Sequence, residues 1–228
     1  MPETHSKQYM EYFPEINRYV PAMGYAGDIS EGGIAQIDFG APAVSAADNI
    51  LNDQSINAAV TVQRASLLSY RSDARFGRNL RVIASGAATS TVDVYGRDCY
   101  GQPMRETLTL NGNTKVDGVK AFYVIDRIVF GATSSTTVDV GWNTSFGLPY
   151  KTTSVIKETA DGVTANAGTL TAPVLTDPQT ATTGDPRGRY VPTTTPDGSK
   201  QLSIVALCDD GVNASGNGGL MGIAHKGS

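Results

Sequence analysis

The stretch Arg78–Leu110, RNLRVIASGAATSTVDVYGRDCYGQPMRETLTL, carries the clearest fold signal in the chain. Apolar and polar residues alternate in three runs, as in strands with one buried face, because successive strand side chains point to opposite faces of a sheet. The apolar positions are Leu80, Val82 and Ala84, then Val92 and Val94, then Leu108 and Leu110. Turn-forming residues separate the runs, including Gly86, Gly96 and Gly101. The stretch predicts an antiparallel meander of about three strands and holds no evident catalytic group.

The composition agrees with an all-β protein. The chain has 228 residues, enough for one all-β domain with decorations or two small domains. It contains 25 glycines, which serve turns, and 24 threonines, which as β-branched residues suit strands. Strand and turn signals recur at roughly the 8–12-residue spacing of a sandwich or barrel. We therefore predict an antiparallel β-sandwich, jelly-roll-like or immunoglobulin-like, with an extended N-terminal arm.

The chain divides into two regions by pattern. Residues 1–55 are predicted to form an N-terminal arm and extended segment, and residues 56–228 a β-sandwich domain with a flexible C-terminal tail. Further strands are expected near residues 34–39, 59–70, 116–130, 136–140, 151–160, 168–175, 188–191 and 201–207. For residues 59–70 a helix is the alternative, because Ala65, Leu67 and Leu68 would also fit one. Val116–Phe130 is the strongest core candidate, and Trp142 is expected to cap the core from a loop.

The start of the arm is aromatic. Its large side chains include Tyr9, Tyr12, Phe13 and Tyr19. They are too apolar for a plain flexible tail, so an arm that becomes ordered against a neighbouring subunit would explain them, and a disordered terminus is the alternative. We predict these four residues as partner contacts.

Charge argues against a nucleic-acid partner. The net charge is −4 and the isoelectric point is near 5.1, whereas a phosphate backbone attracts clustered Lys and Arg. The arginines Arg71, Arg75, Arg78 and Arg81 do form a short basic run. Such a run indicates either a solvated loop and strand edge or a contact with an acidic partner surface.

The cysteines and the apolar runs suggest a location. Cys99 and Cys208 are too few for a disulfide framework, so we expect free thiols in a protein assembled in a reducing cytoplasm. No apolar run approaches the roughly 20 residues that span a bilayer. The N-terminal MPETHSKQYM lacks the pattern of a secretory signal. No membrane association is predicted.

Candidate catalytic groups are sparse. The two histidines, His5 and His225, lie close to the chain ends, where a rigid catalytic pair is seldom held. No zinc-type cluster or nucleotide-binding loop is evident. Carboxylate pairs could arise from Asp93 with Asp98 or Asp126 with Asp139, although acidic residues on the polar face of strands are the commoner explanation. We predict no enzyme activity, no cofactor and no metal.

Several stretches together resemble a family. They are GRNLRVIASGAATSTVDVYGRDCYGQPMRETLTLNG (77–112), VDGVKAFYVIDRIVF (116–130), TTVDVGWNTSFGLPYKT (136–152), NAGTLTAPVLTDPQTATTGDPRGRYVPTTTPDGSK (166–200) and GGLMGIAHK (218–226). This string of strands and turns resembles the head decoration, or capsid cement, proteins of tailed bacteriophages. The resemblance runs from about residue 56 to residue 226, and the preceding segment departs from it as an added arm.

The resemblance implies a structural role. Such proteins are implied to sit on the outside of an icosahedral shell, often as dimers or trimers, where they bridge capsomers and resist the pressure of packaged DNA. The expected partners are the major capsid protein and further copies of the chain, and the expected location is the capsid surface of the virion. The alternatives are a tail, collar or fibre component, or a sugar-binding or sugar-cleaving β module using Trp142, Tyr150 and a carboxylate pair.

Overall fold

The computed structural model describes residues 9–13, 18–22, 32–133, 135–209, 211 and 219–223. Strands make up almost all of its regular structure, with one short 3₁₀ helix at Arg64–Ser66. The strands are β1 (Tyr9–Phe13), β2 (Arg18–Ala22), β3 (Gly32–Gly40), β4 (Leu51–Ser55), β5 (Val60–Gln63), β6 (Arg78–Ala84), β7 (Thr91–Arg97), β8 (Pro103–Thr109), β9 (Val116–Phe122), β10 (Val124–Phe130), β11 (Thr137–Gly147), β12 (Thr152–Ala160), β13 (Val163–Ala165), β14 (Thr169–Thr171), β15 (Arg189–Val191) and β16 (Leu202–Asp209). The predicted all-β class is confirmed.

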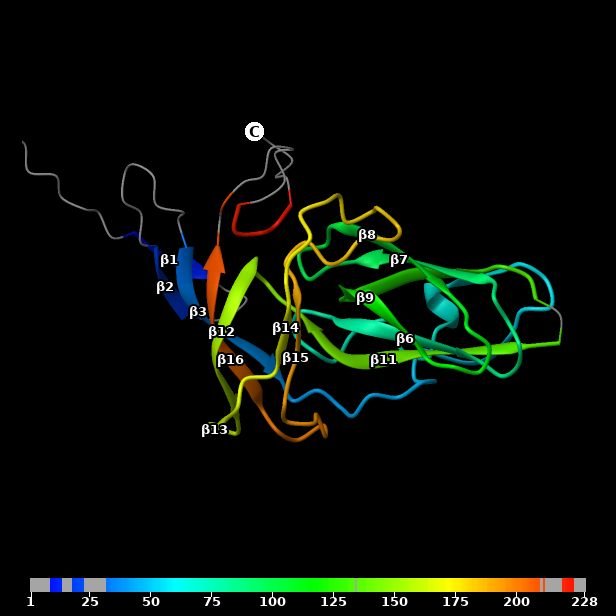
Figure 1. Cartoon of the computed structure of the whole chain (residues 1–228), viewed down its shortest axis with the longest axis horizontal. Coiled ribbons are helices and arrows are strands. Elements are labelled where there is room, and N and C mark those ends of the chain that lie inside the picture. The colour runs from blue at the N-terminus through cyan, green and yellow to red at the C-terminus, as the bar shows by residue number, and fades with distance from the viewer. Residues whose placement is uncertain are drawn as a thin grey trace, which may run out of the picture.

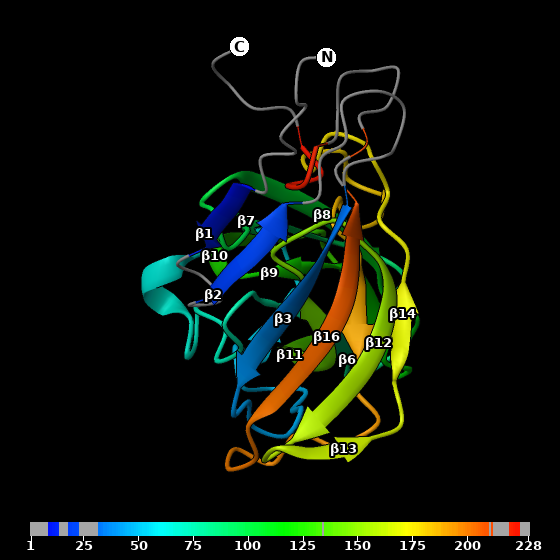
Figure 2. The same cartoon turned by 90° about the vertical axis from the view of Figure 1, so that its left-hand side faces the viewer.

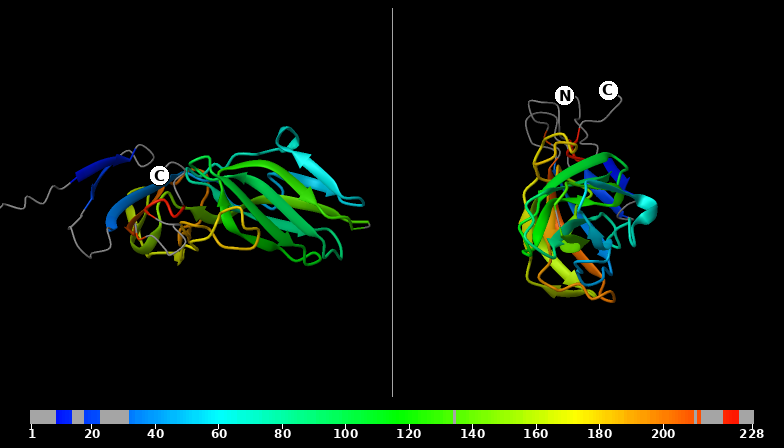
Figure 3. Two further views of the ribbon diagram at one scale, coloured as in Figure 1. Left: turned by 90° about the horizontal axis from the view of Figure 1, so that it is seen from above. Right: turned by 90° about the vertical axis from the view of Figure 1, so that its right-hand side faces the viewer.

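Three sheets build the body of the molecule, and all named strand pairs are antiparallel. One has four strands in the order β5-β10-β7-β8, a second joins β14-β15-β11-β6-β9 with β4 also on β11, and a third runs β13-β12-β16-β3. Figures 1 and 3 show two β-rich halves along the long axis of the molecule. The arrangement is sandwich-like, as predicted.

Two hydrophobic cores fill the two halves. The first lies between the four-stranded sheet of β5, β7, β8 and β10 and the strands β6 and β11, with Leu80, Val94, Ile128 and Phe130 among its buried residues. The second lies under β3, β12 and β16 and contains Phe39, Phe146 and Tyr190. Strand β11 belongs to both, since Val138, Val140 and Trp142 pack in the first core and Phe146 packs in the second.

The predicted three-stranded meander is only partly correct. Strands β7 and β8 form an antiparallel hairpin, but β6 pairs with β9 and β11 instead of β7. The turn after Ala84 therefore carries the chain from one sheet to the opposite one. The physical reason is that Leu80 and Val94 must both reach the same core, which they do from facing sheets.

Strand β11 is longer than the sequence predicts. The expected strand ends near Val140, whereas β11 continues to Gly147 through Trp142 and Asn143. Trp142 is buried, in agreement with its predicted contact with the core, but it lies on a strand and not in a loop. The polar residues Asn143 and Ser145 interrupt the apolar alternation expected of a strand. Their backbone groups pair with side chains of β6.

The segment before residue 56 also contributes to the sheets. Strand β3 pairs with β16 along Gly32–Gly40, and Ala35, Ile37 and Phe39 are buried in the second core. Strand β4 pairs with β11. Strands β1 and β2 form a separate antiparallel hairpin. Two strands of the region predicted as an arm and extended segment thus lie in the body of the molecule.

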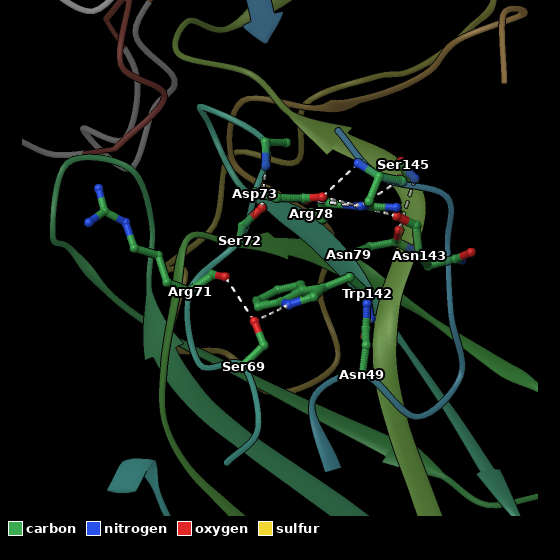
Figure 4. A network of polar contacts seen from close by, with 12 residues as sticks. Asn49, Ser69, Arg71, Ser72, Asp73, Arg78, Asn79, Trp142, Asn143 and Ser145 are labelled. Carbon is green, nitrogen blue, oxygen red and sulfur yellow. Dashed lines mark hydrogen bonds and ion pairs between the residues drawn. The ribbon is translucent and has the colours of Figure 1, made fainter. Parts of the chain in front are cut away.

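A bulge in β11 joins the two cores. The ladder between β6 and β11 is regular up to Trp142, which pairs with Leu80, and resumes only at Phe146, which pairs with Arg78. In the gap, the Arg78 side chain donates from Nε to the Asn143 carbonyl at 2.6 Å, and Asn79 Oδ1 accepts from the Ser145 amide at 3.0 Å. Figure 4 shows these side chains filling the place of the missing backbone pairs. Side-chain hydrogen bonds therefore satisfy the bulged backbone.

Arg78 is held by further contacts. Its side chain has no exposed surface and its Nη1 atom donates to Asp73 at 2.9 Å and to the Ala43 carbonyl at 3.1 Å. The guanidinium lies 5.6 Å from the centre of the Phe146 ring. Burial lowers the pKa of Arg78, and Asp73 opposes that effect. The buried charge is thus compensated by a carboxylate and two carbonyls.

We expect Arg78→Met to destabilise the fold by about 3–5 kcal/mol, because it leaves the carbonyls of Ala43 and Asn143 and the carboxylate of Asp73 without their buried donor. Arg81→Met is the matched control on the same strand, since Arg81 pairs with Asp117 at 2.6 Å but both side chains are partly exposed, and it should cost about 0–1 kcal/mol. Urea unfolding of both variants measures the difference. Equal losses would contradict the assigned role of Arg78.

Candidate binding interface

Some strand edges of the molecule are covered by its own chain. Strand β8 ends the four-stranded sheet, and the segment 177–181 lies along its outer edge. The amides of Arg105 and Thr107 donate to the carbonyls of Pro178 at 3.1 Å and Ala181 at 2.8 Å. These bonds use donors that would otherwise be free to pair with another strand, so the β8 edge is closed.

A buried lysine fastens this cover. Lys120 of β9 donates from Nζ to the carbonyls of Arg105 at 2.9 Å, Pro178 at 2.5 Å and Thr180 at 2.6 Å. The three acceptors use all three ammonium protons. Burial lowers the pKa of Lys120, and the nearby carboxylate of Glu106 opposes this shift. A single cation thereby connects β8, β9 and the covering segment.

Glu106 lies beside this lysine and has an unusually high pKa. Its side chain is buried, and one carboxylate oxygen accepts from the Val119 amide. Burial raises the pKa of Glu106 to about 7, although backbone hydrogen bonds and Lys120 act in the opposite direction. The group therefore titrates near neutral pH, which makes the region under the β8 edge sensitive to pH.

A buried ion pair anchors the far end of the covering segment. Arg187 contacts Asp98 at 2.9 Å, with side chains only 2% and 1% exposed, and its Nε donates to the Leu148 carbonyl at 2.9 Å. Asp185 accepts from the amides of Ala121 and Arg187. These contacts make Asp98 part of the interior.

The edge at β3 is different. Strand β3 ends the sheet β13-β12-β16-β3, and the outer face of that sheet carries exposed apolar side chains. Ile34 of β3 and Leu207 of β16 are direct cross-strand partners and are 54% and 40% exposed. Ile156 of β12 is 53% exposed. Figure 2 looks onto this sheet, with β2 and β1 beside β3. We call Ile34, Ile156 and Leu207 the apolar strip.

The four predicted contact residues lie in the hairpin beside this strip. Tyr12 pairs with Tyr19 across the hairpin, Phe13 pairs with Arg18, and Tyr9 pairs with Ala22. Their side chains are outside the described part of the structure. The structure therefore brings the backbone of the predicted residues to the same end of the molecule as β3, while the apolar strip itself was not predicted. The only signal for it in the sequence is the alternation in Ile34–Phe39.

The candidate catalytic groups are not assembled. Asp98 is buried against Arg187, whereas Asp93 accepts from Arg105 on the outer face of a sheet. Asp126 belongs to the four-stranded sheet and Asp139 to the sheet containing β11. Neither predicted carboxylate pair is therefore arranged as a pair. Trp142 and Tyr150 are 2% and 1% exposed, so they cannot form the stacking surface suggested for a sugar module.

The predicted basic run is also dispersed. Arg78 is buried, Arg81 pairs with Asp117, Arg75 contacts Asp38 at 3.4 Å, and Arg71 stacks on the Tyr123 ring. Arg78 and Arg81 lie on opposite faces of β6, and Arg71 and Arg75 lie in the segment before that strand. Both cysteines are free, and burial raises the pKa of each thiol to about 12, which makes them unreactive at neutral pH.

Comparisons with known proteins do not identify the chain. A scan against protein-family models, a search of curated proteins and a search of solved structures each find no match. In the described ranges, no group of three or more His, Cys, Asp or Glu side chains is placed to hold a metal ion. No helix found there is long and apolar enough to cross a membrane.

We expect Lys120→Met to open the β8 edge. Without the ammonium, three carbonyls lose a charged donor and the segment 177–181 is held less firmly. Amide exchange of Arg105 and Thr107 should accelerate by roughly 10–100-fold. The Leu110 amide, which donates to the Ser90 carbonyl at 3.0 Å at the other end of the strand, is the internal control. Hydrogen exchange by NMR measures these rates. A uniform acceleration at all three amides would argue against a local effect of Lys120 on the β8 edge.

Glu106→Gln is expected to change how stability depends on pH. Burial raises the pKa of Glu106 from an ordinary 4.5 to about 7, so between these values the folded protein holds a proton that the unfolded chain has lost. The contribution of Glu106 to the free energy of unfolding is therefore complete below about pH 4.5 and is lost as the pH rises to about 7. The change is at most ~3 kcal/mol. Urea unfolding from about pH 4.5 to 8 should show this fall for the wild type and a shallower one for the variant. Parallel curves would exclude Glu106 as the cause.

Proposed function

We propose that this chain is a structural virion protein that binds the outer surface of a phage icosahedral capsid and stabilises it by bridging capsomers. The observation that carries the proposal is the apolar strip on an edge sheet, next to a hairpin with four large aromatic residues. The family resemblance of residues 56–226 supplies the kind of partner, the major capsid protein.

Binding to the capsid would rest on many weak contacts. Full burial of an exposed Ile or Leu side chain contributes about 1.5–3 kcal/mol, so the half-exposed residues of the apolar strip would contribute roughly 1 kcal/mol each, and aromatic side chains add larger areas. On a symmetric shell, each such contact is repeated at every equivalent position. An edge strand with an arm also suits contact between copies of the chain, so the proposal includes a dimer or trimer.

Removal of residues 1–22 should weaken binding to capsids by about tenfold or more without unfolding the sheets, because the hairpin is not hydrogen-bonded into a larger sheet. Ile34→Ser combined with Leu207→Ser should have a similar effect. Leu68→Ser is the matched control, since Leu68 is 71% exposed but lies outside the apolar strip. Co-sedimentation with capsids of the encoding phage, at several protein concentrations, gives the affinities.

Two outcomes would overturn the proposal. Equal capsid binding by the wild type, the truncated protein and the double variant would remove this end of the molecule from the interface. Selective binding to purified tails or collars, with none to capsids, would favour the alternative structural location. Light scattering of the free protein tests the oligomer, for which a dimer or trimer is expected and a monomer would contradict exchange of the arm.

A further inference from the structure

A second surface, of different chemistry, covers the outer face of the four-stranded sheet β5-β10-β7-β8. Its centre is Tyr95 of β7, which lies directly opposite Arg127 of β10 and Arg105 of β8. The Arg127 guanidinium is 3.8 Å from the centre of the Tyr95 ring, and that of Arg105 is 5.3 Å away. Both guanidiniums therefore lie over one aromatic ring, which limits the conformations they adopt in solution.

Two further arginines extend this surface. Arg64 and Arg97 both pair with Asp126, and Arg97 lies 3.2 Å from it. Arg105 pairs with Asp93 at 3.0 Å. We call the four arginines Arg64, Arg97, Arg105 and Arg127 the arginine face. Two carboxylates serve four guanidiniums, so this face is positive in a chain whose net charge is −4.

The arginines remain available for a ligand. The side chains of Arg64, Arg97 and Arg105 are 45%, 49% and 39% exposed. Arg127 is exposed and, among the described residues, no ion-pair partner is found for it. Its guanidinium keeps its five N–H donors while resting on the ring. A carboxylate approaching the sheet can therefore be bound by a fork of two parallel hydrogen bonds.

The remaining chemistry of the face limits the class of ligand. None of the large apolar side chains found exposed in the described chain belongs to β5, β7, β8 or β10, so the centre of the face lacks the apolar anchors of a protein interface. Exposed Leu68 and Tyr70 follow the 3₁₀ helix at the margin of the face, where the Arg64 guanidinium lies 5.6 Å from the centre of the Tyr70 ring. Asp93 and Asp126 lie among the arginines and would repel a ligand that offers closely spaced anions alone, whether phosphates or carboxylates. They are instead well suited to accept hydrogen bonds from hydroxyl groups, as are Thr61 and Gln63 on β5.

We infer that the arginine face binds an acidic polysaccharide, a polymer that combines spaced carboxylates with many hydroxyl groups. Arg105 and Arg127 are two strands apart, which separates their backbones by about 10 Å, so they would bind carboxylates of different sugar units. This surface lies in the half of the molecule away from β3 and β16 (Figure 1), and it is independent of the capsid-binding proposal. It also differs from the sugar site predicted around Trp142 and Tyr150, which are buried.

The test compares two polymers with the same backbone. Polygalacturonate carries a carboxylate on each sugar, and its fully methyl-esterified form carries none. Isothermal titration at low salt should detect binding of the acidic form only, weakening as salt is raised. Arg105→Ala combined with Arg127→Ala should reduce the affinity by about tenfold or more. Arg127→Lys, which keeps the charge but loses the fork, should reduce it less.

The controls separate a site from general charge attraction. Arg75→Ala removes one exposed arginine that lies outside the face and pairs with Asp38, and it should leave the affinity unchanged. Far-ultraviolet circular dichroism and the unfolding temperature establish that each variant is folded. Equal losses for Arg75→Ala and the double variant would overturn the inference. So would absence of binding to polygalacturonate, or equal binding to poly-glutamate or duplex DNA, which would indicate that only charge is recognised.

Discussion

The bulge in β11 is the constraint on which the two-core architecture depends. An antiparallel ladder that continued without interruption from Trp142 would hold β11 against β6 along its whole length, within one sandwich. The interruption turns the strand so that Phe146 reaches the second core. It is tolerable only because the Arg78 and Asn79 side chains bind the Asn143 carbonyl and the Ser145 amide. Two adjacent side chains of β6 therefore allow a single strand to serve both halves.

Local pattern was sufficient to locate most strands but not to pair them. The alternation in Leu80–Ala84 and Val92–Val94 depends only on which side chains are buried, and that is the same whether two strands are neighbours or face each other across a core. The continuation of β11 was missed for a related reason. Asn143 and Ser145 have the composition of a loop, and their partners come from β6, far away in the sequence.

The surfaces, like the strands, could be predicted from the sequence only where they depend on residues close together in the chain. Aromatic composition was enough to select Tyr9, Tyr12, Phe13 and Tyr19, whose contribution to binding stays a prediction. The apolar strip depends on the pairing of Ile34 with Leu207, which no local pattern encodes. The basic run in the sequence was Arg71–Arg81, but the fold distributes its four arginines among different environments. The arginine face instead gathers residues from β7, β8 and β10 and from the 3₁₀ helix.

Two surfaces of opposite character, one in each half of the molecule, have a mechanical consequence. An apolar surface with an arm excludes solvent when it is bound, which suits permanent attachment. Exposed guanidiniums over a tyrosine instead form contacts that salt weakens and that exchange readily. Attachment at the β3 end would leave the arginine face outside the contact, since the strands that carry it lie in the other half (Figure 1). Many copies fixed on one shell would then present this weak site repeatedly, and repetition raises the total affinity for a polymer without any change in the single site.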